Sequence, residues 1–401
     1  MSLTIVNAGQ NYHIRGGSEQ YQFALAQLLH HYGHQVIPFA AEHPKNQITP
    51  WSKYFPRRVN FEQPTSKDLL EFVYSRSAAL SMENLLCDHR IDLAHLHIYY
   101  GQLTTSILSP LKKANVPIVQ TLHEYKTVCP VYTLMSNGEI CQACNGQTFW
   151  QATLKRCNRG SLPRSILSTV ESYVSKMLGS INKIDHFIAV SYFQKEKLVE
   201  LGLPDDKVTT VHNFINVSDY QPSSAPGKYF LYFGRLEQSK GIFTLIEAAS
   251  LIKDTPLLIV GDGTASSELR NLIQERELNH ISLLGFKHKQ ELQKLISHSI
   301  CTITPSQWYE TFGLTLIESF AYAKPVIASR IGGMTEIVTD GIDGYLVDPG
   351  NVKQLRERML WMAEHSSQAR KMGLAGRRKV EMHFNSESHY QKLVSVYQKI
   401  L

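Results

Sequence analysis

The sequence has no apolar run of the roughly 20 residues that a membrane-spanning helix needs. It also has no charged segment followed by an apolar leader, so we expect the protein to be made and kept in the cytoplasm. Cysteine is scarce, with 6 in 401 residues, which argues against a disulfide scaffold. The net charge of +6 is mild; it favours anionic partners and does not predict nucleic-acid binding.

Short apolar segments alternate with helical patterns along most of the chain, which predicts parallel strands in doubly wound sheets. In the first half, the predicted strands are 2–8, 34–40, 92–97, 117–123, 186–191 and 208–215. In the second half, they are 229–235, 256–263, 280–286, 300–305, 325–329 and 344–348. We therefore predict an α/β protein with two Rossmann-like domains that face each other across a cleft.

The predicted domain boundaries follow changes in composition. The first domain covers 1–220, with a cysteine-containing insertion at about 124–160 and one long helix at 67–89. Two prolines, two serines and a glycine mark 221–228 as a linker. The second domain covers 229–384, and a last helix, 385–401, is expected to pack back on the first domain.

Residues 305–325 carry two glutamates in different settings. Glu310 lies in a loop after the strand at 300–304, and Glu318 lies inside a helix that the apolar spacing starts at Phe312. A helix that begins at the carboxyl edge of a sheet offers N–H groups to an anion, and Gly313 permits close approach. The alternative is an ordinary strand–loop–helix unit with two solvated glutamates.

Two glycine turns follow strands in the same way. The first, GRLEQSKG at 234–241, contains Arg235 and Lys240, which together suit a diphosphate; the alternative is a surface turn with solvated bases. The second, with Gly16 and Gly17, directs backbone N–H groups toward a phosphate or a sugar hydroxyl, or is a plain turn. It lacks the dinucleotide fingerprint, which disfavours NAD.

Two histidines, His97 and His123, each end an apolar strand of the first domain. Such an edge places them for acid, base or hydrogen-bond work, although a structural role is the alternative for each. Four cysteines of the insertion include one CxxC pair and form a candidate structural zinc site, with free thiols as the alternative. These four are Cys129, Cys141, Cys144 and Cys157. The other two, Cys87 and Cys301, are predicted to be buried and inert.

Residues 150–183 carry six basic side chains and a single acidic one, Glu171, interleaved with apolar residues. This pattern is typical of a basic amphipathic segment that rests on an anionic membrane surface. A core-packed helix with a solvated basic face is the alternative. On the first interpretation, the protein is peripheral on the inner face of the cytoplasmic membrane and its acceptor is lipid-linked.

Taken in order, these segments resemble the retaining nucleotide-sugar glycosyltransferases of the GT-B fold, the large group 1 family. Glu310 and Glu318, with seven residues between them, match the two-glutamate signature of that family. The matching segments span nearly the whole chain: GG at 16–17, HE at 123–124, HN at 212–213, GRL…KG at 234–241, GDG at 261–263, LGF at 284–286 and PSQWYETFGLTLIE at 305–318.

The resemblance implies a donor site in the second domain for a UDP- or GDP-sugar. Arg235 and Lys240 would hold the diphosphate, and Glu318 would bind the ribose hydroxyls. Glu310 would contact the transferred sugar. The base would meet Gly285 and Phe286, and the distal phosphate would meet the N–H groups of Phe312, Gly313, Leu314 and Thr315.

In the first domain, the resemblance places Gly16 and Gly17 toward the diphosphate or acceptor and His123 near the reacting sugar. Family members retain the anomeric configuration, by front-face attack with assistance from the leaving phosphate. The implied catalytic residues are His123, Glu310, Arg235 and Lys240, and no catalytic metal is expected, because the cations and a helix dipole stabilise the leaving charge.

The predicted function is transfer of one sugar, with retention, to a hydroxyl of a glycan or lipid-linked glycan in polysaccharide or cell-surface glycan synthesis. One alternative is another GT-B enzyme, such as a nucleotide-sugar epimerase, which would need acid–base pairs in the donor domain. The other alternative is a catalytically silent module that binds sugar nucleotides. The presence of Glu310, Glu318, Arg235 and Lys240 counts against a silent module.

Overall fold

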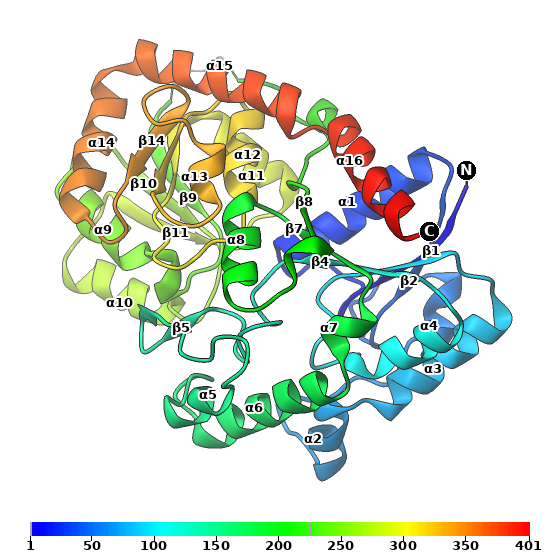
Figure 1. The fold of residues 1–401 in the computed structure, drawn as a ribbon. Helices are drawn as coiled ribbons and strands as arrows, with labels where there is room; N and C mark the ends of the chain where they lie inside the picture. Colours follow the sequence, from blue (N-terminus) through cyan, green and yellow to red (C-terminus); the bar gives the residue numbers. More distant parts are fainter. Residues whose placement is uncertain (1, 224–226) are drawn as a thin grey trace. The chain divides into compact units, whose positions relative to one another are not determined.

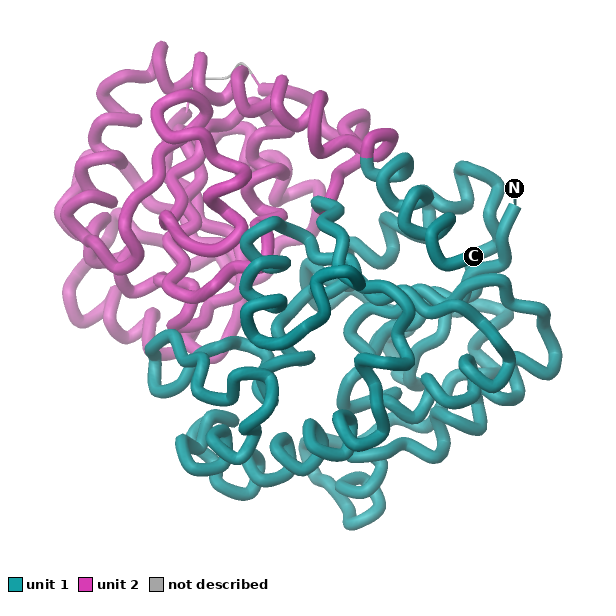
Figure 2. The backbone as a smooth tube through the Cα atoms, viewed as in Figure 1, with its two compact units in different colours: residues 1–212, 389–401 teal, residues 213–388 magenta. Residues whose placement is uncertain are grey.

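The computed structural model describes residues 2–223 and 227–401. The chain forms two compact units, shown in Figures 1 and 2. Unit 1 comprises residues 1–212 and 389–401, and unit 2 comprises residues 213–388. Part of the predicted linker 221–228, namely 224–226, lies outside the described residues.

Unit 1 is built on a six-stranded parallel sheet in the order β2-β1-β3-β4-β7-β8. Its strands are β1 (Thr4–Ala8), β2 (Gln35–Phe39), β3 (Leu93–Leu96), β4 (Ile118–Leu122), β7 (His186–Ala189) and β8 (Val208–Thr210). A short antiparallel hairpin, β5 (Met135–Ser136) and β6 (Glu139–Ile140), lies in the predicted insertion. The strand order reverses beside β1, which creates a switch point at the carboxyl ends of β1 and β3.

The helices of unit 1 cover the parallel strands, whose residues are largely buried on both faces. They are α1 (Gly17–His31), α2 (Ser66–Val73), α3 (Arg76–Asp88), α4 (Leu108–Lys113), α5 (Trp150–Leu154), α6 (Leu162–Met177), α7 (Ser180–Lys183) and α8 (Tyr192–Glu200). The last helix, α16 (Ser386–Ile400), inserts Tyr397 beside β3, where the Tyr397 hydroxyl lies 2.6 Å from His95 Nδ1.

The single long helix predicted at 67–89 is wrong, because the chain breaks there into α2 and α3. Tyr74 and Ser75 adopt extended backbone conformations between the two helices. The Ser75 hydroxyl accepts a hydrogen bond from the Ala78 N–H and so caps α3. A serine that satisfies a free helix donor favours a new helix start over continuation, which the apolar spacing alone does not reveal.

Unit 2 repeats the architecture with a second parallel sheet in the order β11-β10-β9-β12-β13-β14. Its strands are β9 (Tyr229–Phe233), β10 (Leu257–Val260), β11 (Ile281–Gly285), β12 (Ser299–Thr304), β13 (Val326–Ser329) and β14 (Gly344–Val347). Its helices are α9 (Ile242–Ser250), α10 (Ser266–Glu275), α11 (Lys289–Ser297), α12 (Leu314–Ala321), α13 (Met334–Ile337), α14 (Val352–Glu364) and α15 (Ser366–His383). These two sheets confirm the predicted pair of doubly wound α/β folds.

The core of unit 2 shows why its short apolar segments become strands. Phe230, Leu257 and Ile303 of neighbouring strands are almost fully buried against Leu245 and Met359 from the covering helices. The strand order reverses between β9 and β12, so the loops that follow these two strands start at one switch point. Three of the predicted donor residues, Arg235, Lys240 and Glu310, lie on those loops.

Candidate functional site

The loops after β9 and β12 bring Lys240 and Glu310 together at the switch point of unit 2. Lys240 ends the short 3-10 helix η5 (Gln238–Lys240), and its Nζ lies 2.6 Å from Glu310 Oε1. The Ser306 hydroxyl donates a second hydrogen bond to the same oxygen, also at 2.6 Å. The Lys240 ammonium also lies 4.7 Å from the centre of the Trp308 ring. The pair is mostly buried, with side-chain exposures of 16% for Lys240 and 12% for Glu310.

Burial alone would raise the pKa of Glu310. The Lys240 ammonium and the Ser306 hydroxyl outweigh that effect and hold the pKa of the carboxyl below its ordinary value. The site therefore keeps a carboxylate and an ammonium ionised in contact with each other. A carboxylate accepts hydrogen bonds from hydroxyl groups, and an ammonium carries three donors, so the pair has capacity for further polar partners.

Backbone contacts fix the two loops that carry this ion pair. Gly241 adopts a φ of +68°, and a Cβ there would lie 1.8 Å from the carbonyl oxygen of Pro305. Gly332 has a φ of +64°, and its Cβ would lie 2.4 Å from the carbonyl oxygen of Glu310. Both positions combine a left-handed conformation with close backbone approach, which only glycine allows without strain. Sequence reasoning singled out neither Gly332 nor Ser306.

The structure separates Arg235 from this pair. Its side chain is 54% exposed, and its Nη1 lies 3.0 Å from Glu237 Oε1 on the surface turn. Tyr232 of β9 supports the turn from below, because its hydroxyl donates to the Arg235 carbonyl at 2.7 Å. Arg235 is thus an accessible cation beside the switch point, whereas Lys240 is an enclosed one.

The helix that follows the Glu310 loop starts later than predicted. Its first residue is Leu314, with Gly313 as the residue that caps it, whereas Phe312 is buried and packs edge-on against Phe384. Phe312 is therefore an anchor of the loop rather than part of the helix. Leu314 and Thr315 open the first turn of α12, and Thr315 Oγ1 lies 3.4 Å from Thr304 Oγ1 at the end of β12.

Glu318 lies on the second turn of α12 and is partly buried. Its neighbours are Tyr220 and Tyr322, whose rings meet edge-on at 5.2 Å between centroids. Burial raises the pKa of Tyr322 to about 12, and the Glu318 carboxylate adds to that rise. The two signature glutamates thus have separate surroundings, one against an ammonium and the other beside two tyrosines.

The end of β11 carries Gly285 and Phe286. Gly285 has a φ of +67°, and its carbonyl accepts a hydrogen bond from the Gly261 N–H at 2.9 Å. The Phe286 side chain that follows is 72% exposed and meets His288 edge-on. An exposed aromatic ring at the carboxyl end of a strand is a surface on which a flat ligand ring can stack.

In unit 1, the two predicted histidines lie side by side at the ends of β3 and β4. His97 Nδ1 lies 3.0 Å from His123 Nε2, and their rings stack at 5.3 Å between centroids. The other nitrogen of His97 lies 2.7 Å from Asn7 Oδ1, on β1. Sequence reasoning missed Asn7; the only signal was a polar residue inside an apolar strand.

Burial lowers the pKa of both histidines. It lowers the pKa of His123 to about 3 and that of His97 well below its ordinary value. His97 is 1% exposed, whereas His123 is partly exposed. Tyr21 of α1 packs edge-on against both rings, at 5.8 Å from His97 and 5.2 Å from His123. Both imidazoles are therefore neutral at physiological pH.

The predicted glycine turn of unit 1 marks the start of α1. Gly16 is the capping residue, in an extended conformation, and Gly17 is the first residue of the helix. The first turn also contains Glu19, which accepts a hydrogen bond from the Asn11 side chain at 3.1 Å. The turn follows β1, so it lies at the carboxyl edge of the sheet of unit 1.

The four insertion cysteines, the candidate zinc ligands, lie near one another, since the thiols of Cys129, Cys141 and Cys157 all act on that of Cys144. Within residues 2–223 and 227–401, no three His, Cys, Asp or Glu side chains are arranged to hold a metal ion. Burial raises the pKa of Cys144 to about 12, and the nearby thiols of Cys129 and Cys157 add to the rise. Lys155 instead donates to Cys141 Sγ at 3.4 Å. As arranged, the buried thiols are protonated and pack as small apolar groups.

The prediction for the remaining cysteines holds for one of them. Cys301 is fully buried on β12, as its apolar context indicated. Cys87 is exposed, contrary to the prediction, because it lies on the outer face of α3 next to the exposed Asp88. An amphipathic helix near its end permits a single apolar residue to face solvent, and local composition does not reveal this.

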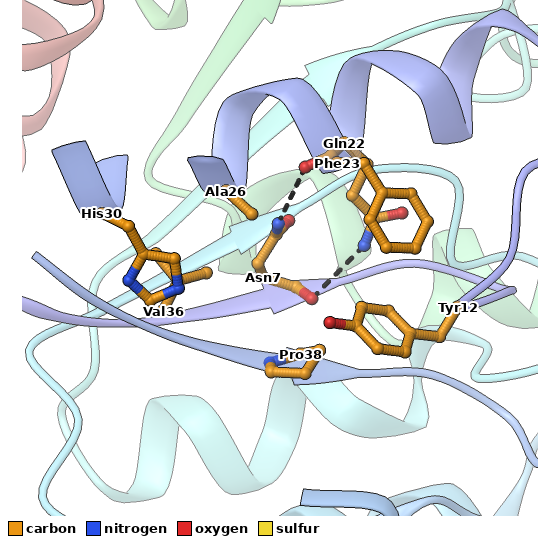
Figure 3. Close-up of a pocket in the computed structure, with 8 residues that line it drawn as sticks. All are labelled: Asn7, Tyr12, Gln22, Phe23, Ala26, His30, Val36 and Pro38. Carbon is orange, nitrogen blue, oxygen red and sulfur yellow. Dashed lines mark hydrogen bonds between the residues drawn. The ribbon is translucent and has the colours of Figure 1, made fainter. Parts of the chain in front are cut away.

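A small cavity in unit 1 lies between α1 and the first two strands (Figure 3). Its volume is about 30 Å³, roughly that of one water molecule. It is lined by Asn7, Tyr12, Gln22, Phe23, Ala26, His30, Val36 and Pro38. The cavity is too small for a sugar, so it is a packing feature behind the candidate site.

Comparison with known proteins assigns both halves of the chain. Residues 15–219 match the family described as Glycosyltransferase Family 4, and residues 219–379 match Glycosyl transferases group 1. The first of these matches covers half of the chain. The chain belongs to Glycosyltransferase Family 4. The second half of the glycosyltransferase matches the group 1 model, whose motifs the sequence resembles.

Individual relatives of the glycosyltransferase are distant. The uncharacterized glycosyltransferase MJ1178 of Methanocaldococcus jannaschii is 29% identical over 54% of this chain and 59% of its own length. The D-rhamnosyltransferase WbpZ of Pseudomonas aeruginosa is 28% identical over 57% of this chain and 60% of its own length. This chain therefore spans less than two thirds of either relative in these alignments.

Two solved structures share the fold over the whole glycosyltransferase. One is a glycosyltransferase from Rickettsia africae, with a TM-score of 0.71, 20% identity and coverage of 100% of this chain and 98% of that one. The other is Anabaena Alr3699/HepE in complex with UDP and glucose, with a TM-score of 0.67, 17% identity and 99% coverage of both chains. At these identities, the likeness shows the GT-B fold alone.

Proposed function

We propose that this glycosyltransferase transfers a sugar from a nucleotide diphosphate sugar, with retention of anomeric configuration, to a hydroxyl of a glycan or lipid-linked glycan. The observation that carries the proposal is the ion pair of Lys240 and Glu310 at the switch point of unit 2. It places a fixed cation and a hydrogen-bond-accepting carboxylate where doubly wound sheets bind ligands. A donor sugar needs both groups, since it joins hydroxyls to a diphosphate.

The departing nucleoside diphosphate gains negative charge as the bond to the sugar breaks. Lys240, Arg235 and the first turn of α12 supply positive charge and N–H dipoles toward that group. Because Lys240 is enclosed and its position is fixed by Glu310, it requires little reorganisation when the charge develops. The same phosphate then accepts the proton of the acceptor hydroxyl, which attacks from the same face and so retains the configuration.

The other groups of the donor have matching partners in this proposal. Glu310 uses its second carboxylate oxygen, Oε2, to accept a hydrogen bond from a hydroxyl of the transferred sugar. Glu318 binds the ribose hydroxyls, and the exposed ring of Phe286 stacks against the base. His123 of unit 1 contacts the reacting sugar, and Gly16 and Gly17 offer N–H groups to diphosphate or acceptor.

The named relatives support a nucleotide-sugar donor and a polysaccharide context. Anabaena Alr3699/HepE was solved with UDP and glucose, and also with UDP-glucose. One relative is the O-antigen chain mannosyltransferase C of Escherichia coli. We therefore propose a UDP- or GDP-sugar donor and an acceptor in cell-surface glycan synthesis.

The test is a transfer assay on the full chain with isotope-labelled UDP-, GDP- and ADP-sugars, chosen by the thermal shift that each unlabelled donor produces. We expect one donor to yield labelled glycan and free nucleoside diphosphate, with the anomeric proton coupling of the product showing retention. Glu310→Gln and Lys240→Met are the matched inactive controls. Inverted product would overturn the retaining mechanism.

Two other outcomes would replace the proposal with its alternatives. Binding of a sugar nucleotide without turnover, across a panel of glycan acceptors, would identify a silent binding module. Conversion of one free nucleotide sugar into its epimer without any acceptor would identify an epimerase. The neutral state of His123 and the ion-paired state of Glu310 argue against an epimerase, which needs groups that exchange protons at neutral pH.

The surface of α6 supports a peripheral membrane location. The helix is inverted relative to a normal amphipathic helix, because its most buried side chains are polar and its exposed face is apolar. The exposed large apolar residues of α6 are Leu162, Ile166, Val170 and Met177, and the Met177 side chain is 83% exposed. None of the helices in the described part of the chain has the length and hydropathy of a membrane-spanning segment.

Hydrogen bonds hold the polar face of α6 inward. Glu171 Oε2 lies 2.5 Å from Lys126 Nζ, and both side chains are buried. Ser168 accepts a hydrogen bond from Asn158 at 2.9 Å, and Thr169 Oγ1 accepts one from Thr153 at the same distance. Since these bonds prevent the helix from turning over, its apolar face stays at the surface.

The charge around α6 favours an anionic bilayer as the partner of this face. The exposed basic residues of the segment are Lys155, Arg156, Arg159, Arg164 and Lys176. The single carboxylate of residues 150–183, Glu171, is neutralised by Lys126. Apolar side chains beside unpaired cations suit the interface of anionic lipids.

Vesicle co-sedimentation tests this location. We expect binding to phosphatidylcholine mixed with phosphatidylglycerol, weaker binding at high salt, and little binding to phosphatidylcholine alone. A triple variant of α6 (Ile166→Ser, Val170→Ser and Met177→Ser) should bind at least about tenfold more weakly, because each buried apolar side chain contributes about 1.5–3 kcal/mol. The matched control changes the exposed Leu374 and Met382 of α15 to serine. Equal binding by both variants would contradict the proposal.

A further inference from the structure

A chain of three polar side chains runs along the carboxyl edge of the sheet of unit 1. It begins at Asn7 on β1, continues through His97 after β3, and ends at His123 after β4. The two contacts measure 2.7 Å from Asn7 Oδ1 to His97 Nε2 and 3.0 Å from His97 Nδ1 to His123 Nε2. Neither Asn7 nor His97 has a role in the donor chemistry described above.

The backbone carbonyl of Gln22 determines the direction of each hydrogen bond among these three side chains. Asn7 donates its side-chain N–H to the carbonyl oxygen of Gln22 at 3.2 Å, and the Gln22 amide donates back to the Asn7 carbonyl at 3.3 Å (Figure 3). A carbonyl oxygen only accepts, so the amide of Asn7 cannot be reversed, and Oδ1 must face His97.

The tautomers of both histidines then follow in turn. An Oδ1 acceptor requires a proton on His97 Nε2. His97 is neutral, so its Nδ1 carries a lone pair and must accept from His123. His123 therefore carries its proton on Nε2, and its Nδ1 is the lone-pair nitrogen.

We propose that Asn7 and His97 are positioning residues that fix His123 in the Nε2–H tautomer, so that its Nδ1 accepts a hydrogen bond from a substrate hydroxyl. The role of His123 at the sugar rests on the proposed function, whereas the tautomer stands on the geometry of unit 1. His123 in this form orients a hydroxyl and does not take up a second proton or transfer one, in agreement with its strongly lowered pKa.

Packing holds the relay, which is the hydrogen-bonded series Asn7, His97 and His123, in place from two further sides. The His95 ring stacks on His97 at 4.6 Å, and Tyr21 packs edge-on against His97 and His123. These neighbours are neutral, and they fill the space around the imidazoles without offering a charge that would favour an imidazolium. The relay therefore selects one tautomer instead of stabilising a charged ring.

Nitrogen NMR of ¹⁵N-histidine-labelled full chain tests the tautomer without donor or acceptor. A His123→Gln variant assigns the signals of His123 among the 17 histidines. We expect a protonated Nε2 and a lone-pair Nδ1 in the wild-type protein. In Asn7→Leu, which removes the oxygen acceptor, we expect a mixture of tautomers.

Kinetics provide the second measurement. Asn7→Leu should lower kcat about tenfold, the worth of one hydrogen bond, with little change in KM for the donor. Gln22→Leu is the matched control, because it removes the neighbouring bond to the Asn7 carbonyl yet leaves the Gln22 backbone oxygen in place. It should keep both the tautomer and kcat.

A proton on Nδ1 of His123 in the wild-type protein would overturn the inference, whatever the variants do. An unchanged tautomer and kcat in a folded Asn7→Leu variant would do the same. The predicted tautomer in a protein that transfers no sugar would instead refute the proposed function and leave the relay standing, so the two failures are distinguishable.

Discussion

The two candidate sites hold their polar side chains in opposite electrical states. In unit 2, Lys240 and Glu310 are both ionised, because each offsets the burial cost of the other at 2.6 Å. In unit 1, His97 is buried and His123 is partly buried among neutral partners, and burial lowers the pKa of both. The difference indicates separate roles: the site of unit 2 suits binding of a charged group, and the site of unit 1 suits orientation of an uncharged hydroxyl.

The largest expected effect comes from breaking the charged site. Lys240→Met leaves the Glu310 carboxylate buried without its cation, so we expect unit 2 to lose about 3–5 kcal/mol of unfolding free energy. Arg235→Met removes a cation that is 54% exposed, and should change stability by less than about 0.5 kcal/mol. Urea unfolding of both variants measures the contrast.

Ligand binding should not show the same contrast. Both substitutions remove a charged donor proposed for the diphosphate, so each should weaken UDP or GDP binding by about 1.5–3 kcal/mol in calorimetry. The double variant Lys240→Met with Glu310→Gln is the control, and it should recover part of the lost stability but none of the binding. Equal stability of the two single variants would refute the buried-pair argument.

The buried neutral histidines predict that the stability of unit 1 falls in acid. Burial lowers the pKa of His95 to about 3 and that of His389 to about 4, from an ordinary value of 6.5. Below about pH 6.5 these histidines bind protons in the unfolded chain but stay neutral in the folded protein. The free energy of unfolding therefore falls as the pH drops toward the folded pKa values. Each such histidine contributes a slope of up to about 1.4 kcal/mol per pH unit.

On acidification, unit 2 should respond only at a lower pH than unit 1. The pKa of Glu310 is lowered, so its contribution to stability is present above its ordinary value of 4.5 and is lost only as the pH falls below it. Hydrogen exchange with mass spectrometry, corrected for intrinsic rates, should show β4 losing protection between about pH 6.5 and pH 5 while β12 keeps it. His389→Gln should reduce the slope for β4. Loss of protection in β12 first would contradict the comparison.

The sequence predicted strand ends well, and with them the neighbourhoods of both sites. Apolar segments that stop at His97 and at His123 became adjacent strands, because the parallel order of the sheet follows from alternation with helices. The partners of these side chains were not predictable. Asn7 lies 90 positions from His97, and Lys240 lies 70 positions from Glu310, so only the folded sheet brings each pair together.

The errors in the predicted helices come from contacts that the apolar spacing does not show. The break between α2 and α3 depends on the Ser75 cap, which competes with helix continuation by one hydrogen bond. The helix α12 starts at Leu314 rather than at Phe312 because Gly313 adopts a non-helical φ of +127°, and Phe312 before it packs against Phe384 across 72 positions. The inverted face of α6 depends on partners such as Lys126, outside the helix. The apolar periodicity of α6 shows that one face of the helix is apolar, but it does not show which face is buried.

The smallest effect is expected at Phe286, which belongs neither to the ion pair of unit 2 nor to the neutral histidines of unit 1. Its ring is 72% exposed, so Phe286→Ala should leave the stability of unit 2 within about 0.5 kcal/mol of the wild type. Loss of stacking against the base should weaken nucleoside diphosphate binding by at least about 1 kcal/mol, or about fivefold. Phe286→Tyr keeps an aromatic face and is the matched control. If pyrophosphate, which has no base, lost as much affinity as UDP, the ring would act through the loop rather than by stacking, and the base would lie elsewhere.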